Sequence, residues 1–508
     1  MPDGEAGAPP LSTGAILHKT ARGAGWVIGW RMARRLLGFI NLLVLARLLV
    51  PADFGVVALA AGLAGSLDAL ATVGVEDALV REKALNRALY DTGFTMNVLR
   101  GLLTGGALAA LAVPAAWFFR DPRLTDVILV LAALTIAAAF TNIGTVDFRR
   151  DMAFQKEFAL LAIPRIVGFL VTLLIALQWH SYWALVAGIA TNRLLQLGQS
   201  YIMHPYRPQI SLRSWRKIIR FSLWSWAMSV VISLKDRTDN FLIGHVLGDA
   251  AVGTYALALE IGDLPSSELV GPLTRACYSS FAASRASGQG NREVYLRILG
   301  AVALFSVPAS IGLSAVADVA VRLLLGAKWL QAIPLVQAFG LFGSVAVFGL
   351  LSYNLLSVYG VFAAQFRVLV LSATVRLTLL LIFVWRLGLM GAVLAAGIGV
   401  VVEFIGYFSI AVVRFQIGWG DLARALWRTV LGTAAMSAAL AATGLGWASA
   451  SGDSVPALLR ALMEAVAVGA FVYGAVVTGG WLAAGRPEGA EADVLTLLRK
   501  RLRSAKPA

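Results

Sequence analysis

Charged and amide side chains recur inside apolar stretches of this sequence, and they fall at helical spacing. In four of these stretches the polar positions recur at helical spacing and so share one helix face. The planar fork of arginine pairs with two phosphate oxygens at once, and lysine adds a point charge. We therefore expect a hydrated, net-cationic cavity that fits an anionic, hydroxyl-rich group. Its candidate lining residues are Arg31, Arg35, Asn41, Lys235, Arg237 and Asn240.

Carboxylates accompany these cations on neighbouring helix faces. A carboxyl group in a poorly hydrated site is able to exchange a proton or bind a sodium ion. We therefore treat five residues as candidate ion-coupling or cavity carboxylates: Asp68, Asp236, Asp239, Glu260 and Asp263.

Structural interpretations stay open beside the functional ones. Arg31 and Arg35 lie in the first turns of their stretch, where a long side chain can reach the cytoplasmic interface. The same holds for three further arginines of the first half: Arg100, Arg165 and Arg193. Lys235 could pair with Asp239 along its own helix. Arg376 could pair with Glu403 across a helix interface.

The elements that carry these residues are predicted to be transmembrane helices. Hydrophobic residues make up 59% of the 508 positions and charged residues 14%, against roughly 25% charged in a soluble chain. The apolar runs have the length of helices that cross a bilayer and lack the alternation of barrel strands. We predict an all-α polytopic membrane protein with about fourteen spans, at 26–49, 54–75, 93–118, 124–146, 157–178, 183–202, 221–244, 251–274, 298–317, 332–356, 363–385, 388–413, 429–446 and 456–482.

The connectors alternate in charge, which predicts the orientation. Most cations lie in every second connector and in the two termini, so both termini are expected in the cytoplasm. The net charge of +15 is explained by this bias and does not indicate nucleic acid. A single cysteine, Cys277, excludes an internal disulfide and a cysteine metal cluster. Scattered histidines and the lack of a phosphate-binding loop motif predict no metal and no cofactor.

An internal repeat relates the two halves of the sequence. Residues 45–60 read LARLLVPADFGVVALA and residues 243–258 read IGHVLGDAAVGTYALA, with Gly55 aligned on Gly253 at an offset of 198 residues. A repeat of six spans predicts two six-helix bundles related by an axis along the membrane normal. The expected parts are a flexible cytoplasmic N-terminus (1–24), a first bundle (25–202), a basic linker (203–220), a second bundle (221–413), two extra helices (414–482) and a basic cytoplasmic tail (483–508).

Four stretches resemble one known family. They read LARLLVPADFGVVALA at 45–60, VDFRRDMAF at 146–154, DNFLIGHVLGDAAVGTYALALEIGDLP at 239–265 and VADVAVRLLLGAKWLQAIPLVQAFGLFG at 316–343. In this order and spacing the chain is similar to the Wzx/WzxC-like lipid-linked oligosaccharide flippases. These form the polysaccharide transporter branch of the multidrug/oligosaccharidyl-lipid/polysaccharide superfamily.

The resemblance implies a fold like that of the multidrug antiporters of this superfamily, and movement of undecaprenyl-diphosphate-linked glycan units from the cytoplasmic to the periplasmic leaflet. By the same resemblance, Arg31, Arg35, Lys235 and Arg237 would meet the diphosphate or acidic sugars. Arg47 and Pro51–Gly55 would form an outer gate. The implied setting is the bacterial cytoplasmic membrane. Expected partners are the lipid-linked glycan, membrane lipid, a proton or sodium gradient, and polymerase and chain-length proteins of an export pathway, around a monomer.

Two other functions remain as alternatives. An ion-coupled multidrug antiporter would favour an apolar, acidic pocket for organic cations, and the arginines disfavour it. A membrane-embedded polysaccharide polymerase would need a catalytic carboxylate in a sizeable external loop, whereas the external connectors are short. We therefore expect a transporter that is not an enzyme.

Overall fold

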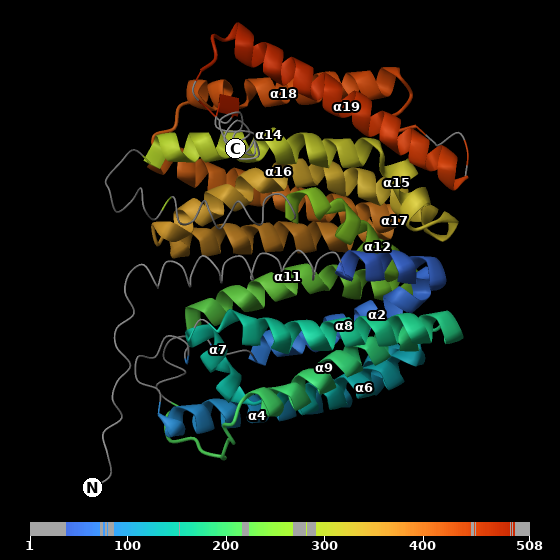
Figure 1. Cartoon of the computed structure of the whole chain (residues 1–508), viewed down its shortest axis with the longest axis vertical. Helices are drawn as coiled ribbons and strands as arrows, with labels where there is room; N and C mark the ends of the chain where they lie inside the picture. The colour runs from blue at the N-terminus through green and yellow to red at the C-terminus, as the bar shows by residue number, and fades with distance from the viewer. Residues whose placement is uncertain are drawn as a thin grey trace, which may run out of the picture. The chain divides into compact units, whose positions relative to one another are not determined.

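The computed structural model describes residues 37–71, 75–76, 79, 86–151, 153–215, 223–267, 281, 291–448, 452, 454–487, 489 and 491–492. Its regular structure is helical, and no strand occurs in this described part (Figure 1). The chain divides into two compact units, which we describe separately. Unit 1 comprises Met1–Leu49 with Leu59–Val230, and unit 2 comprises Val50–Ala58 with Val231–Ala508. Two helices pass from one unit into the other: α2 (Pro51–Ala71) and α11 (Leu223–Leu247).

The first described helix of unit 1 is short and apolar, Leu37–Leu48, and it precedes α2. Its other elements are α4 (Arg87–Ala110), α5 (Ala112–Phe119), α6 (Arg123–Ala139), η1 (Ile143–Val146), α7 (Asp147–Arg150), α8 (Phe154–Trp179) and α9 (Trp183–Met203).

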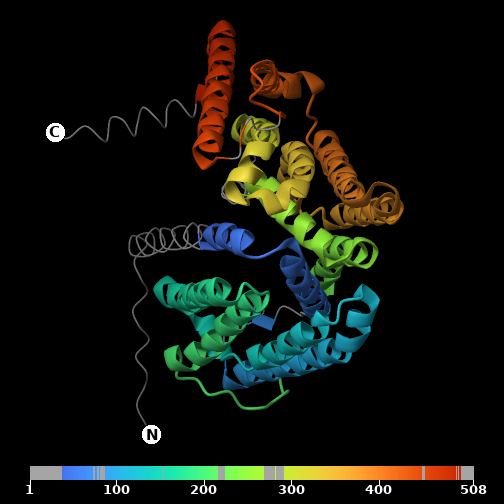
Figure 2. The same ribbon diagram turned by 90° about the vertical axis from the view of Figure 1, so that its right-hand side faces the viewer.

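Small residues allow the helices of unit 1 to approach closely. α4 and α6 lie side by side in both views (Figures 1 and 2). A Cβ on Gly101 would come within 2.1 Å of the Cβ of Ala139, and one on Gly105 within 2.4 Å of Cγ1 of Ile136. This is the small-xxx-small spacing by which membrane helices pack without a hydrophobic driving force.

The polypeptide that follows α9 is held against the start of α4. The Tyr206 hydroxyl donates a hydrogen bond to Asp91 at 2.5 Å, and the Gln209 N–H donates to the same carboxylate at 2.8 Å. The Ser211 N–H donates to the Thr95 hydroxyl at 2.9 Å. Burial, together with the Asp91 carboxylate, raises the pKa of Tyr206, so its hydroxyl remains a donor. The first part of the predicted linker is thus fixed to unit 1.

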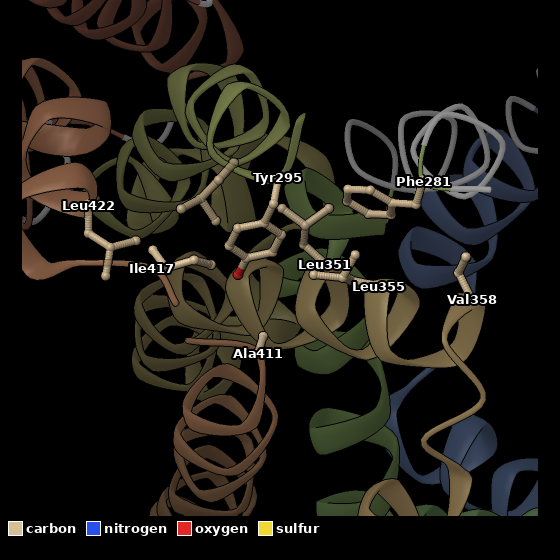
Figure 3. Packing of buried hydrophobic residues seen from close by; sticks show 9 residues of the cluster. Phe281, Tyr295, Leu351, Leu355, Val358, Ala411, Ile417 and Leu422 are labelled. Atoms are coloured by element: carbon tan, nitrogen blue, oxygen red, sulfur yellow. The ribbon is translucent and has the colours of Figure 1, made fainter. Parts of the chain in front are cut away.

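Unit 2 contains most of α11 and the remaining helices. They are α12 (Asp249–Gly262), α14 (Asn291–Ala315), α15 (Ala317–Leu324), η3 (Ala327–Ala332), α16 (Ile333–Val358), α17 (Phe362–Arg414), α18 (Trp419–Ala442) and α19 (Val455–Ala483). The buried Tyr295 of α14 packs against Leu351 and Leu355 of α16 in one apolar cluster (Figure 3). Its hydroxyl forms a hydrogen bond of 2.9 Å with Ser352 in this cluster, so the polar end is satisfied.

α17 is a hairpin of two helices. Its 53 residues would form a straight helix about 80 Å long, far more than the hydrocarbon thickness of a bilayer. The helix breaks at Gly388, where φ is 60° and ψ is −137°. Behind the break the chain folds back, because a Cβ on Gly391 would lie only 2.2 Å from the carbonyl oxygen of Phe383. The predicted spans 363–385 and 388–413 meet at this glycine.

Seven helices in the described part are long and apolar enough to cross a membrane, and up to nine if each of two bent pairs counts as one span. The prediction of a polytopic helical membrane protein is therefore confirmed at this level. The bent pairs are α4 with α5, at 44°, and α6 with residues 143–150, at 73°.

Candidate functional site

The starts of α2 and α12 pack against each other within unit 2. α2 begins at Pro51, and α12 begins after Gly248, whose φ is 87°. A Cβ on Gly55 would lie 1.8 Å from the carbonyl oxygen of Asp249, and a Cβ on Gly253 would lie 1.9 Å from that of Pro51. Both positions therefore require glycine at this crossing.

The crossing is reciprocal. Pro51 and Asp249 are related by the same offset of 198 residues as Gly55 and Gly253. In each copy of the repeat, the glycine therefore packs against a backbone carbonyl of the other copy. The ring of Phe54 packs edge-on against the fully buried Trp329, with ring centroids 5.4 Å apart.

Two of the residues that the family resemblance assigned to an outer gate, Pro51 and Gly55, lie at this crossing. The third, Arg47, is exposed near the end of the helix Leu37–Leu48 in unit 1.

A charged cluster joins α11, α12 and α17 inside unit 2. Lys235 Nζ lies 2.7 Å from Oε1 of Glu403, and the Ser372 hydroxyl donates to the same oxygen at 3.1 Å. Arg376 donates to Oδ2 of Asp239. The Lys235 side chain is 13% exposed and that of Arg376 is 11% exposed, so both cations are largely buried in protein.

Asp239 is the most buried carboxylate of this charged cluster, at 1% exposure. The buried Tyr255 hydroxyl donates to its Oδ2 at 2.6 Å. Asp236 lies further out, with Oδ1 3.8 Å from Nη1 of Arg376 and half of its side chain exposed. The charged cluster thus holds two cations and three carboxylates, and charges in such surroundings need partners.

The pairing differs from the two pairs that the sequence suggested. Lys235 pairs with Glu403 instead of with Asp239 on its own helix, and Arg376 pairs with Asp239 instead of with Glu403. Tyr255 was not recognised from sequence, although it lies in the second copy of the repeat. A contact of Lys235 with substrate stays a prediction.

The other predicted residues are dispersed. Arg237 is exposed and Asn240 half-buried on α11, and Glu260 and Asp263 are exposed at the end of α12. Arg31 and Arg35 lie outside the described residues. In unit 1, Asn41 is half-buried, and its Oδ1 is buried without a hydrogen-bond partner.

Asp68, also in unit 1, forms an ion pair of 3.5 Å with Arg100 of α4. Arg193 of α9 donates to the Thr135 hydroxyl of α6 at 3.0 Å. Two of the arginines for which the sequence allowed an interfacial position therefore contact polar groups of neighbouring helices.

A cavity of about 610 Å³ lies in unit 2 between α14, α18 and the chain that follows α19. Its wall includes Arg428, which holds Glu491 through two hydrogen bonds of 2.5 and 3.1 Å. None of the predicted substrate residues lines it. No group of three or more metal-ligating side chains occurs among the residues that the structure describes.

Comparison with known sequences decides the family. The profile described as "Polysaccharide biosynthesis protein" matches residues 44–334, which is more than half of the chain. The chain belongs to this polysaccharide biosynthesis protein family. The match begins shortly before the α2 crossing and ends at the start of α16.

Two curated bacterial proteins are similar to the chain at low identity. It is 24% identical over 328 residues to the lipopolysaccharide biosynthesis protein WzxC of Escherichia coli, covering 64% of this chain and 66% of WzxC. It is 22% identical over 315 residues to the succinoglycan biosynthesis transport protein ExoT of Rhizobium meliloti, covering 62% of this chain and 64% of ExoT. The alignments thus span slightly less than two thirds of these relatives.

Solved structures show the same fold. The lipid II flippase MurJ, in an inward closed conformation, superposes with a TM-score of 0.70 at 12% identity and covers 91% of this chain and 99% of MurJ. An inward-facing multidrug resistance transporter of the MATE family gives a TM-score of 0.52 at 18% identity, covering 75% and 94%. At these identities the likeness concerns the fold alone.

Proposed function

We propose that this protein moves lipid-linked oligosaccharide units from the cytoplasmic to the periplasmic leaflet for polysaccharide biosynthesis. The observation that carries the proposal is the family match over residues 44–334, whose relatives include a named polysaccharide transport protein. The MurJ-like fold supports it, since MurJ is named a lipid flippase. The family resemblance extends the proposal to undecaprenyl diphosphate as the lipid carrier.

The mechanism that we propose is alternating access in the cytoplasmic membrane. Fourteen spans would form two six-helix bundles, at 25–202 and 221–413, with two further helices and both termini in the cytoplasm. The glycan and diphosphate would enter between the bundles while the polyprenyl tail stays in lipid. The reciprocal packing of α2 and α12 supports the twofold relation between the halves. We further propose that a proton or sodium gradient drives the cycle, and that the protein acts as a monomer beside polymerase and chain-length proteins.

Deletion of the gene in its host tests the proposal. Single lipid-linked glycan units should accumulate, and a membrane-impermeant oxidant added to spheroplasts should fail to label them until the gene is restored. Labelling of the accumulated units from outside would contradict a flippase and indicate the polymerase alternative. Increased dye sensitivity with normal glycan export would instead indicate a drug antiporter.

The predicted cationic residues are tested separately by single alanine substitutions at Arg31, Arg35, Lys235 and Arg237, with surface polysaccharide measured at matched protein level. Reduced export is expected for these variants. Export like wild type in all four would contradict the cavity assignment. Arg460, an exposed residue of α19, provides the matched arginine control.

A further inference from the structure

The cavity of about 610 Å³ in unit 2 lies between the ends of three helices. Glu293 lines it near the start of α14 and Arg424 near the start of α18, and Ala484 lines it directly after the end of α19. α18 packs against both α14 and α19 (Figure 1). Each of the three helices is long and apolar enough to cross a membrane. The volume of the cavity is that of a small-molecule site.

The chain that follows α19 is anchored as one wall of the cavity. The Trp481 indole N–H donates to the carbonyl oxygen of Pro487 at 3.1 Å. Arg428 donates through Nε and Nη2 to the two carboxylate oxygens of Glu491, and the Arg428 side chain is only 8% exposed. A buried, two-pronged pair of this kind fixes the geometry of both partners. The cavity is therefore a formed part of the fold.

Two arginines of α18 line the cavity one helix turn apart. Arg424 donates through Nε to the Gly420 carbonyl at 3.2 Å and through Nη2 to Asp421 at 2.7 Å. Arg428 uses the same two nitrogens for Glu491. Neither Arg424 nor Arg428 donates through Nη1 to a residue that the structure describes. Because side chains at i and i+4 are neighbours on a helix, both guanidiniums can donate to one phosphate group.

The charged groups at the cavity leave one net positive charge. Its wall contains three arginines and three carboxylates, and Arg292, next to this wall, donates to Asp421. The four cations are Arg292, Arg297, Arg424 and Arg428, and the three anions are Glu293, Asp421 and Glu491. A group with a single negative charge therefore neutralises the set. A phosphodiester carries that charge.

An apolar surface adjoins the two arginines. Leu296, Ala425 and Trp427 all line the cavity. The partly exposed Trp427 lies against α19, where a Cβ on Gly480 would be 3.4 Å from Cη2 of its ring. Tryptophan offers a large apolar surface, which hydrocarbon can cover. A site that combines arginine forks with such a surface fits an amphiphile better than a free anion.

We propose that this cavity binds the headgroup of an anionic phospholipid. Arg424 and Arg428 bind the phosphodiester, and Trp427 contacts the glycerol and the first carbons of the acyl chains. This lipid is a component of the bilayer, so the inference does not rest on the proposed transport of a lipid-linked glycan. Its binding stabilises the junction of α14, α18 and the chain after α19. A zwitterionic phospholipid binds more weakly, because it adds a cation to a set that is already positive.

Native mass spectrometry of the full-length protein in detergent tests the charge preference. The probes are dioctanoyl phosphatidylglycerol and dioctanoyl phosphatidylcholine, which have the same acyl chains. Wild type should bind phosphatidylglycerol about tenfold more tightly. R424Q should lose about tenfold in affinity for phosphatidylglycerol, because a charge-assisted bond is removed. R460Q, an exposed arginine variant of α19, should bind like wild type. Equal affinity of wild type for both lipids, or wild-type affinity in R424Q, would overturn the proposal.

Thermal unfolding separates the loss of a binding site from misfolding. The Arg424 side chain is 79% exposed, so lipid-free R424Q should melt like wild type. Phosphatidylglycerol should raise the melting temperature of wild type and raise that of R424Q less.

Inorganic phosphate and W427A distinguish a lipid from a soluble anion. Millimolar phosphate should leave phosphatidylglycerol bound, and W427A should weaken the lipid severalfold. Displacement of the lipid by phosphate, together with wild-type lipid affinity in W427A, would show a soluble anion site and overturn the assignment to a phospholipid.

Discussion

Gly55 and Gly253 occupy equivalent places in one helix crossing, each against the backbone carbonyl at the start of the other's helix. Gly55 faces Asp249, and Gly253 faces Pro51. The contact is isologous in the way that a twofold interface is, although both surfaces belong to one chain. The repeat that is visible in the sequence is therefore also a physical contact.

Replacing either glycine by alanine should weaken this crossing. A methyl group at Gly55 or Gly253 would overlap a carbonyl oxygen, and overpacking of this kind costs about 1–3 kcal/mol. We expect a lower melting temperature for G55A and G253A in detergent, and reduced glycan export. The double variant should lose less than the sum of the singles, since both residues form one contact.

Gly106 offers the matched control, because no atom lies within 4 Å of its Cβ position on α4. G106A should be neutral or stabilising by up to about 1 kcal/mol through helix propensity. If G55A melts like G106A, the crossing is not tightly packed.

Variants of the Lys235–Glu403 pair can distinguish a structural role of Lys235 from a contact with substrate. K235M leaves the Glu403 carboxylate with the Ser372 hydroxyl, and breaking a largely buried pair costs about 3 kcal/mol. The double variant K235M/E403M removes both charges and should recover most of the stability. Glycan export then decides the role. Recovered export shows that Lys235 acts within the pair, whereas lost export at restored stability shows a contact with substrate.

Arg376 should be among the most sensitive residues of unit 2. R376L leaves Asp239 buried with only the Tyr255 hydroxyl, and we expect a loss of about 3–5 kcal/mol. D236N should change stability by less than about 1 kcal/mol, because that side chain is half exposed and lies 3.8 Å from Arg376. Thermal unfolding in detergent measures both. Equal losses in the two variants would contradict the difference in burial.

Asp91 should control the segment that follows α9. D91A removes the acceptor for the Tyr206 hydroxyl and the Gln209 N–H, and each unsatisfied group costs about 1–3 kcal/mol. We expect trypsin to cut faster at Arg207 and Arg213 in D91A than in wild type. Y206F loses a single hydrogen bond and should show a smaller increase. Unchanged cleavage in D91A would mean that other contacts hold the segment.

The helical membrane fold could be predicted from sequence because the bilayer requires long apolar helices, and their composition is plain in this chain. The alignment of Gly55 with Gly253 singled out both glycines, but it did not predict that the two copies of the repeat contact each other. The break at Gly388 falls at the first residue of the predicted span 388–413.

The ion pairs could not be predicted in the same way. Lys235 and Glu403 are 168 residues apart, and their contact depends on how α11 packs against α17. Along-helix spacing favoured Asp239 as the partner of Lys235, but the buried Arg376 binds that carboxylate instead. The contacts of the linker with α4 could not be predicted either. They are made by backbone N–H groups that donate to Asp91 and Thr95, and such bonds leave no pattern in the side-chain sequence.

α2 is a continuous helix that carries Gly55 at the glycine crossing and Asp68 thirteen residues beyond Gly55. That distance is about 20 Å, so a tilt of about 10° at the crossing would displace the Asp68 carboxylate by about 3–4 Å. Such a displacement is comparable to the separation of Asp68 from Arg100. A change in the packing of two glycines would thereby alter the ion pair between Asp68 and Arg100, because one helix carries both Gly55 and Asp68.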